Sequence, residues 1–321
     1  MPIVVNSNAS ATSASFNLSK ANNSLRNSLA RLSSGNKINS PADDAGGLAV
    51  AYKLNSKLNR TKAVIQNSQN ALSYLQVQDA GLQTVGKVLD RMSELRTMAQ
   101  DITKNSGDIE NYSKEFVELQ SQLQQVKQEK FNGISLFSQE QTAAATGSLT
   151  ETSVTVDGST YDKFGRTLIT HSDGEAASGS ISLNVVNLQF VLSVGTLAVN
   201  TAGTSKDLAG FDNGTAGSNG INASGFISDI LDVNVSQFTQ AIERLAGMRA
   251  ENGAEQNRVL NSIDLLQTNM TNLEAAHGRI MDTDIALEST RFARHNVLVQ
   301  ASAAMTAQAN QLTNVALQLL G

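Results

Sequence analysis

Apolar residues recur every three or four positions over long stretches at both ends of the chain. One such ladder near the start predicts a helix with a single seam: Ala11, Ala14, Leu18, Ala21, Leu25, Ser28 and Leu32. Gly35 follows the last periodic residue, where a left-handed glycine commonly ends a helix. A second ladder predicts a long helix from Pro41 to about Lys104, with Ser40 as its N-cap.

Two more periodic segments extend the helical pattern. A third helix is predicted at about 109–130, and it ends at the turn Phe131-Asn132-Gly133. A fourth is predicted from Val235 or Phe238 to about His277, with its apolar positions in heptad register. Because the second, third and fourth helices all carry an apolar seam, they can share one bundle built from both halves of the chain.

The last helix has an unusual surface. From Asn296 to Gly321 there is no Asp, Glu, Lys, Arg or His, although an apolar seam continues. That seam comprises Leu298, Ala301, Met305, Leu312, Val315 and Leu319. A solvated helix normally carries charge on its outer face, so we expect both faces to be covered, one by the first helix and the other by neighbouring copies.

The middle of the chain has a different pattern. Of the 23 Gly residues, 12 lie within 141–229, between short apolar runs such as 153–156 and 181–194 that predict strands. The Gly-, Asn- and Ser-rich segment 201–224 is typical of a linker or a loop-rich sheet margin. The predicted fold is therefore mainly α with a β insert: a terminal coiled coil, a long-helix bundle from both chain halves, and a small central β-rich domain.

Composition removes several classes of function. The 321 residues include no Cys, no Trp and three dispersed His, so disulfides, thiolate metal sites and imidazole clusters are disfavoured. With a net charge of −5, nucleic-acid binding is also disfavoured. No apolar run is long enough to span a bilayer. We therefore expect no enzyme activity and no catalytic, cofactor-binding or metal-binding residues. We also expect no cofactor, no nucleic-acid partner and no insertion into a membrane.

Candidate chemical sites can be drawn, but each has a simpler interpretation. His277, Asp282, Asp284 and Glu288 could suggest a metal site, although acids two residues apart point to different faces of a helix. A solvated, helix-terminal acid cluster is favoured. A Ser-His-Asp arrangement around His171 lacks a nucleophile elbow. For the Gly46-Gly47 pair, close backbone approach at a subunit contact is favoured over a phosphate loop.

Three sequence segments resemble one protein family. Residues 33–49 (SSGNKINSPADDAGGLA) resemble the flagellin motif that follows the first helix, and Phe131-Asn132-Gly133 resembles its third-helix exit. The segments 282–286 (DTDIA) and 307–311 (AQANQ) resemble the flagellin C-terminal region. The resemblance covers about the first 140 and the last 90 residues, whereas the middle resembles no named family. One departure is the Leu320-Gly321 end, where many flagellins have Arg.

The resemblance implies a structural subunit that polymerises with itself into the filament of the bacterial flagellum. Residues 1–42 and 282–321 would form an inner-tube coiled coil, residues 43–140 and 230–281 an outer-tube bundle, and residues 141–229 a variable, surface-exposed insert. It also implies a secreted, extracellular protein handled by an export apparatus, an export chaperone and a filament cap. The expected polymerisation seam is Leu18, Leu25, Leu32, Leu298, Met305, Leu312, Val315 and Leu319.

The resemblance also implies a contact with a Toll-like receptor. The segment 90–95 (DRMSEL) resembles the central helix motif of the receptor-binding surface, with Arg91 and Leu95 at matching positions and Glu115 as the acidic partner. In this sequence, Ser93 stands where a second Arg is common, and Arg96 replaces a small residue. The alternative is that these residues only make axial contacts within the filament, with Leu95 mostly in the core.

Two other functions stay open on the sequence. One is a secreted helical oligomer that presents an adhesive β domain, and the other is the related junction protein between hook and filament. Deletion of 141–229 would separate the first from a filament subunit, because a filament subunit should still polymerise and an adhesin should lose its activity.

Overall fold

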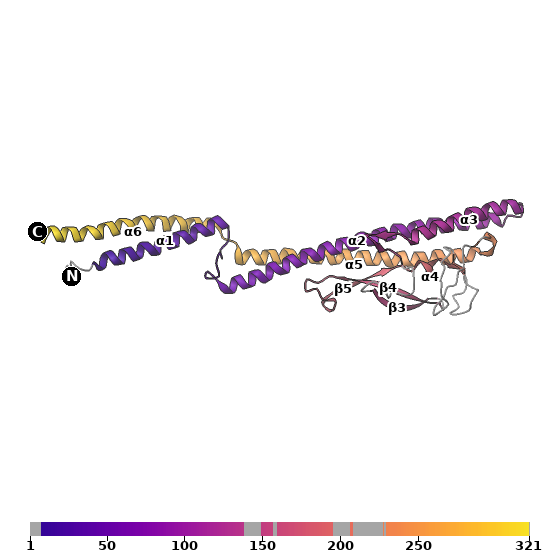
Figure 1. Ribbon diagram of the computed structural model, residues 1–321, viewed down its shortest axis with the longest axis horizontal. Helices are drawn as coiled ribbons and strands as arrows, with labels where there is room; N and C mark the ends of the chain where they lie inside the picture. Colours follow the sequence, from indigo (N-terminus) through magenta and orange to yellow (C-terminus); the bar gives the residue numbers. More distant parts are fainter. Residues whose placement is uncertain are drawn as a thin grey trace. The chain divides into compact units, whose positions relative to one another are not determined.

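The computed structural model describes residues 8–137, 149–156, 159–194, 206–207, 227 and 229–320. Long helices dominate this part of the chain: α1 (Ala9–Ser34), α2 (Ala45–Ala99), α3 (Ser106–Lys127), α5 (Val235–Met281) and α6 (Ile285–Leu320) (Figure 1). The backbone divides into two compact units. We call Met1–Asn59 with Asn269–Gly321 the terminal unit and Arg60–Thr268 the central unit. The expected mainly α fold with a β insert is confirmed.

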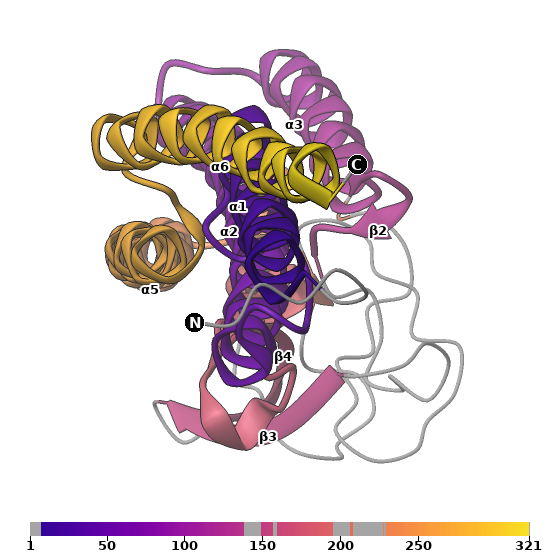
Figure 2. The same ribbon diagram turned by 90° about the vertical axis from the view of Figure 1, so that its left-hand side faces the viewer.

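In the terminal unit, α1 and α6 lie side by side and run in opposite directions (Figures 1 and 2). Asn8 caps α1 by accepting a 3.0 Å hydrogen bond from the Ala11 N–H, and its Nδ2 donates to the Ala309 carbonyl at 2.9 Å. At the other end, Gly35 has φ 72°, and its N–H donates to the Arg31 carbonyl at 2.9 Å. The expected left-handed glycine stop is confirmed.

The start of α2 differs from the prediction. The helix begins at Ala45 and not at Pro41, because Asp44 supplies the cap: its Oδ1 accepts from the Gly47 N–H at 2.9 Å. Ser40 lies before the helix, and its N–H donates to Asp43 Oδ2 at 3.0 Å. Backbone N–H groups of Ser40 and Asn39 hold the pKa of the Asp43 carboxyl below its ordinary value. Both acids therefore organise the backbone of this turn.

The core of the central unit is contributed by α2, α3 and α5. Its fully covered side chains include Leu82, Leu89 and Met92 of α2, Phe116 and Leu123 of α3, and Phe238 and Val259 of α5. The Phe116 and Phe238 rings meet edge to face, with centroids 6.2 Å apart. Asn105 and Asp108 form a capping box at the start of α3. The expected bundle from both chain halves is confirmed.

The β structure starts with a hairpin, β1 (Lys130–Phe131) and β2 (Ile134–Ser135), whose two-residue turn places Asn132 at φ 51° and Gly133 at φ 78°. An antiparallel sheet follows in the order β3 (Leu149–Val156), β4 (Ser159–Ile169), β5 (Ser180–Val185). Shorter elements are η1 (Ala176–Ser178), α4 (Leu188–Leu192), β6 (Ser193–Val194), β7 (Lys206–Asp207) and η2 (Ile230–Asp232).

The insert differs from the sequence prediction at α4 and at β4. The apolar run 181–194 is not strand throughout, because Leu188–Leu192 forms the short helix α4, whose buried Leu188, Phe190 and Val191 pack into the core of the central unit. Strand β4 alternates poorly in hydrophobicity and was not predicted. The segment 201–224 lies outside the described residues except for Lys206–Asp207.

Hydrogen bonds from polar side chains connect the sheet to the helices within the central unit. The buried Gln78 of α2 donates from Nε2 to the carbonyls of Leu136 at 2.8 Å and Asn184 at 3.2 Å. Asn252 of α5 donates to Gln78 Oε1 at 2.6 Å. Glu255 accepts from the Asn184 N–H at 2.9 Å, and burial raises the pKa of this carboxyl. The β insert is thus part of the packed unit.

Candidate assembly surface

The expected seam of α1 lies on the face that α6 covers. Leu18, Leu25 and Leu32 are half-buried, and Ser28 is buried between them. Their spacing of three and four residues keeps them on one side of the helix.

The face of α6 toward α1 is not its apolar seam. Its buried positions are Glu288, Ser302 and Ala309, and its half-buried positions include Phe292, His295 and Val299. These residues alternate steps of four and three and are offset by one residue from the predicted seam. The hydrophobic pattern does not reveal this face, because its buried residues are polar or small.

The predicted seam of α6 is instead exposed in the single chain. Leu298 is 45% exposed and Met305 is 58% exposed, although both are large apolar side chains. Leu287, 51% exposed, lies on the same side of the helix, since 11 residues correspond to about three turns. We call Leu287, Leu298 and Met305 the α6 stripe. The side chains of Leu312, Val315 and Leu319 lie outside the described residues, but positions 312 and 319 continue the stripe by heptad spacing.

Exposed apolar groups also occur on α1. Phe16 is 70% exposed and Leu29 is 55% exposed, and neither position belongs to the seam that faces α6. A helix pair with apolar side chains on its outer surfaces, and no charge after His295, is poorly suited to remain in water as a monomer.

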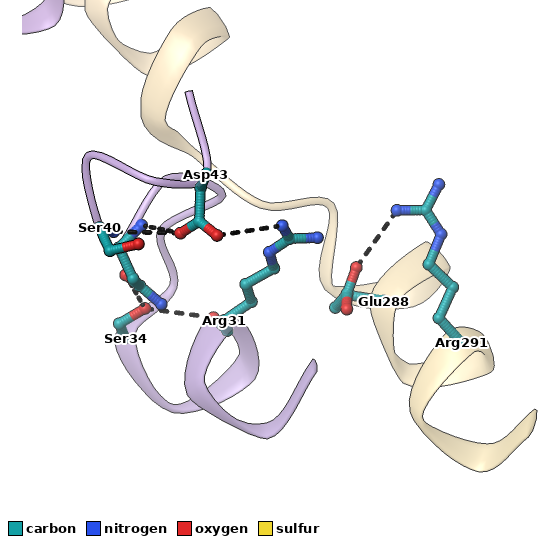
Figure 3. Close-up of polar contacts among 7 residues, drawn as sticks. Arg31, Ser34, Ser40, Asp43, Glu288 and Arg291 are labelled. Atoms are coloured by element: carbon teal, nitrogen blue, oxygen red, sulfur yellow. Dashed lines mark hydrogen bonds and ion pairs between the residues drawn. The ribbon is translucent and has the colours of Figure 1, made fainter. Parts of the chain in front are cut away.

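The loops beside this helix pair hold the end of α1 against the turn between α5 and α6 (Figure 3). The Thr283 N–H donates to the Gly35 carbonyl at 2.9 Å, and the Lys37 N–H donates to the Met281 carbonyl at 2.6 Å. Arg31 Nη2 lies 3.9 Å from Asp43 Oδ1, which joins α1 to the turn before α2. These contacts hold the C-terminal end of α1 beside the start of α6.

The acidic residues near this turn have structural roles. Asp284 caps α6 by accepting from the N–H groups of Ala286 and Leu287, both at 3.0 Å. Glu288 is 3% exposed, and its Oε2 lies 3.4 Å from Arg291 Nη1. In the described ranges, no group of three acidic or His side chains is arranged to hold a metal ion.

The Gly46-Gly47 pair lies against the chain's own loop. A Cβ on Gly47 would lie 2.4 Å from Asp44 Oδ2 and 3.0 Å from the Ile38 side chain. A Cβ on Gly46 would have only an ordinary 3.6 Å contact. The close backbone approach expected at this pair therefore occurs within one chain, at Gly47.

The candidate receptor residues lie on α2 and α3 in the central unit. Arg91 Nε binds Glu115 Oε1 at 2.8 Å, and Arg91 Nη1 binds Glu94 Oε2 at 3.1 Å. Glu115 first, and then Glu94, raise the pKa of the Arg91 guanidinium above its ordinary value. The Arg91 and Glu115 side chains are each 44% exposed, beside a pocket that Arg91, Glu94 and Met98 line. This ion pair is accessible on the single chain.

Leu95 does not join Arg91 and Glu115 on that surface. Its side chain is 0% exposed and belongs to the core, so its assignment as a receptor contact is wrong. The reason is helical spacing, because Leu95 follows Met92 by three residues on the inward face of α2. Arg96 is also buried, and its Nε donates to the Val233 carbonyl that precedes α5.

Comparison with known proteins identifies relatives over almost the whole chain. The sequence matches the bacterial flagellin N-terminal helical region over residues 5–142 and the bacterial flagellin C-terminal helical region over residues 235–320. It is 30% identical to a flagellin of Bacillus subtilis, covering 98% of this chain and 99% of the relative. It is 27% identical to flagellin A of Vibrio anguillarum, and both chains are covered completely.

A solved structure supports the fold. A protein described as flagellar hook-associated, from Vibrio parahaemolyticus, superposes with a TM-score of 0.52 at 15% identity, covering 75% of this chain and 100% of the other. None of the described helices combines the length and hydrophobicity that a bilayer span requires.

Proposed function

Since this chain belongs to the bacterial flagellin family and is a structural subunit of the flagellar filament, we propose that the α6 stripe is the surface through which its copies polymerise. The observation that carries this proposal is an exposed row of large apolar side chains on a helix with no charge after His295. Each Leu buried between copies would contribute on the order of 2 kcal/mol, repeated at every subunit. Leu312, Val315 and Leu319 extend the seam, while Leu18, Leu25 and Leu32 hold α1 against α6.

The other two functions are not favoured. Flagellin relatives match this chain over 98% or more of its length, so the similarity includes the middle of the chain and favours a filament subunit. The similarity to a hook-associated protein concerns the fold alone, because only 15% of residues are identical.

We further propose a place for each part in the filament, which the family membership and the exposed surfaces support. Residues 1–42 and 282–321 form the inner tube, residues 43–140 and 230–281 the outer tube, and residues 141–229 the surface-exposed insert. The subunit is secreted by an export apparatus with an export chaperone, and a filament cap assists its assembly outside the cell. Its role is structural, without catalytic turnover.

Substitution of the α6 stripe tests the polymerisation surface. Leu298→Asp and Met305→Asp should leave the free subunit folded, because both positions are exposed, but a carboxylate buried between copies should block polymerisation. Ser289→Asp is the matched control, since Ser289 is exposed on the opposite side of α6 among charged residues. Seeded polymerisation is followed by sedimentation and electron microscopy, and helicity by circular dichroism. Wild-type polymerisation of both stripe variants would exclude the α6 stripe as a subunit interface.

The accessible Arg91–Glu115 pair supports a second proposed contact, with a Toll-like receptor. Arg91 presents several donors and Glu115 an acceptor on neighbouring helices, an arrangement typical of a binding hot spot. In a reporter-cell assay, the monomer should signal, and Arg91→Ala with Glu115→Ala should reduce its potency by about tenfold or more at unchanged helicity.

The matched control removes another exposed ion pair. Lys114 Nζ lies 2.9 Å from Glu110 Oε1 on α3, and Lys114→Ala with Glu110→Ala should leave the signal unchanged. A silent wild-type monomer would exclude the receptor contact without affecting the filament assignment.

A further inference from the structure

Three side chains with complementary chemistry meet where the sheet packs on α5. Lys163 comes from β4, Asn184 from β5 and Glu251 from α5. One oxygen of the Glu251 carboxylate contacts Lys163 Nζ, and the other accepts a 3.0 Å hydrogen bond from Asn184 Nδ2. A single carboxylate therefore holds an amine and a carboxamide next to each other.

The sheet register fixes this meeting. Gly165 is directly opposite Asn184 in the β4–β5 pair, so Lys163, two residues before Gly165, is on the same face of the sheet as Asn184. A diagonal pair of this kind is within reach of a long side chain. Glu251 lies on the helix that covers this face, since it contacts both residues.

Hydrogen bonds to the backbone of Asn184 also restrain its side-chain carboxamide. Asn184 is 5% exposed, its N–H donates to Glu255 at 2.9 Å, and its carbonyl accepts from Gln78 at 3.2 Å. The side chains of Lys163 and Glu251 are 29% and 36% exposed, so the sheet and helix shield most of their surface from water. Such restraint is what proximity catalysis requires, because reacting groups are held together before the reaction begins.

We propose that Lys163 and Asn184 react to form an intramolecular isopeptide bond, with Glu251 as the proton carrier. Glu251 takes a proton from the Lys163 ammonium group, and the Nζ lone pair forms a bond to Asn184 Cγ. The Cγ–Nδ2 bond then breaks. Glu251 delivers the two protons lost from Nζ to the departing nitrogen, which leaves as ammonium. The products are one secondary amide and one ammonium ion, and no oxidant, reductant or metal takes part.

The bond would stabilise the sheet of this chain. With no Cys, the chain has no disulfide with which to brace its sheet, and an amide between β4 and β5 would provide an equivalent covalent link. Because the three groups come from separate segments, the reaction requires the folded arrangement and cannot precede it. All three residues belong to the central unit, so the bond would form regardless of how subunits polymerise.

Intact mass spectrometry of the full chain tests the proposal. The wild-type protein should be lighter than its sequence by one ammonia, and digestion should yield one branched peptide that joins Lys163 to Asn184. Lys163→Arg keeps the positive charge beside Glu251 but removes the nucleophile, and Glu251→Gln removes the proton carrier. Both variants should have the full mass. Lys114→Arg is the control, and it should keep the deficit because Lys114 contacts only Glu110 among the described ion pairs of α3.

Two results would overturn the proposal. The first is a wild-type protein of full mass, in which Lys163, Asn184 and Glu251 form only an ion pair and a hydrogen bond. The second is a deficit that persists in Lys163→Arg, for example from a succinimide at Asn132-Gly133, which also loses ammonia but joins no second peptide. The branched peptide is sought in the wild-type protein, so the result does not depend on whether a variant folds.

Discussion

Acidic side chains near the helix starts of the terminal unit serve as backbone acceptors. Asp44 accepts from Gly47, Asp284 from Ala286 and Leu287, and Asp43 from Ser40. A cap of this kind stabilises a helix by about 1 kcal/mol, because it satisfies an N–H group that has no partner within the helix. Asp43, Asp44 and Asp284 thus each accept hydrogen bonds from the backbone beside them.

Gly47 gives the sharpest residue-scale prediction. A methyl group there would lie 2.4 Å from Asp44 Oδ2, so Gly47→Ala must displace the cap of α2 or the Ile38 side chain. We expect Gly47→Ala to lower the free energy of unfolding by roughly 1–2 kcal/mol, measured by urea denaturation followed by circular dichroism. Gly46→Ala is the matched control, and it should be neutral or slightly stabilising, since its Cβ has an ordinary 3.6 Å contact. Equal effects of the two substitutions would contradict this account of the cap.

At the scale of elements, the sequence is informative where a signal is local. Gly35 ends α1 as expected, because a left-handed glycine needs only its own backbone geometry. The start of α2 was predicted four residues too early, because Ser40 and Asp44 are both good caps and only the contact with Gly47 distinguishes them. The α1-facing side of α6 could not be predicted from hydrophobicity, since Ser302 and Glu288 are buried there.

Among the candidate sites, too, the sequence indicates positions along the chain but not the contacts that folding creates. The resemblance gives Arg91 and Glu115 as receptor contacts, and the structure adds that the two side chains lie 2.8 Å from each other. Leu95 was placed on the wrong side, because a motif match gives positions in sequence but not the direction in which a helix faces its core. The Lys163–Asn184–Glu251 contact depends on strand register and on packing against α5, and nothing local in the sequence indicates either.

The end of α6 allows a prediction for a whole element. Asn8 Nδ2 donates to the Ala309 carbonyl, so a chain that ends at Ala309 keeps this bond between α1 and α6. Removal of 310–321 nevertheless deletes Leu312, Val315 and Leu319, the last part of the proposed polymerisation seam. We expect the truncated protein to lose polymerisation in seeded electron microscopy while its central unit unfolds at the same urea concentration as in the full chain. Filaments of normal stability from this truncation would show that the seam does not need its final turns.

At the scale of the whole molecule, the insert 141–229 and the bundle are energetically connected. Gln78 and Gln120 are both fully buried, and both donate to backbone carbonyls that lie within 141–229: those of Asn184 and Ile227, respectively. Gln120 Oε1 also accepts from the Ile227 N–H at 2.9 Å. Segment 141–229 thus satisfies polar groups in the core of the central unit.

This connection changes the result expected from deletion of the insert. A simple surface insert could be removed without consequence, but loss of 141–229 removes partners of Gln78 and Gln120, at about 1–3 kcal/mol for each unsatisfied group. It also uncovers core that Leu188, Phe190 and Val191 bury. We expect this deletion to lower the unfolding midpoint of the central unit clearly and to reduce the polymerised fraction.

The matched control replaces only 208–226 with the same number of Gly and Ser residues, which removes none of the contacts described. This control should unfold and polymerise like the wild-type chain. If the large deletion retained wild-type stability, the buried glutamine contacts would not contribute to the fold. If the Gly/Ser replacement proved equally damaging, the stabilising contacts would have to lie in 208–226.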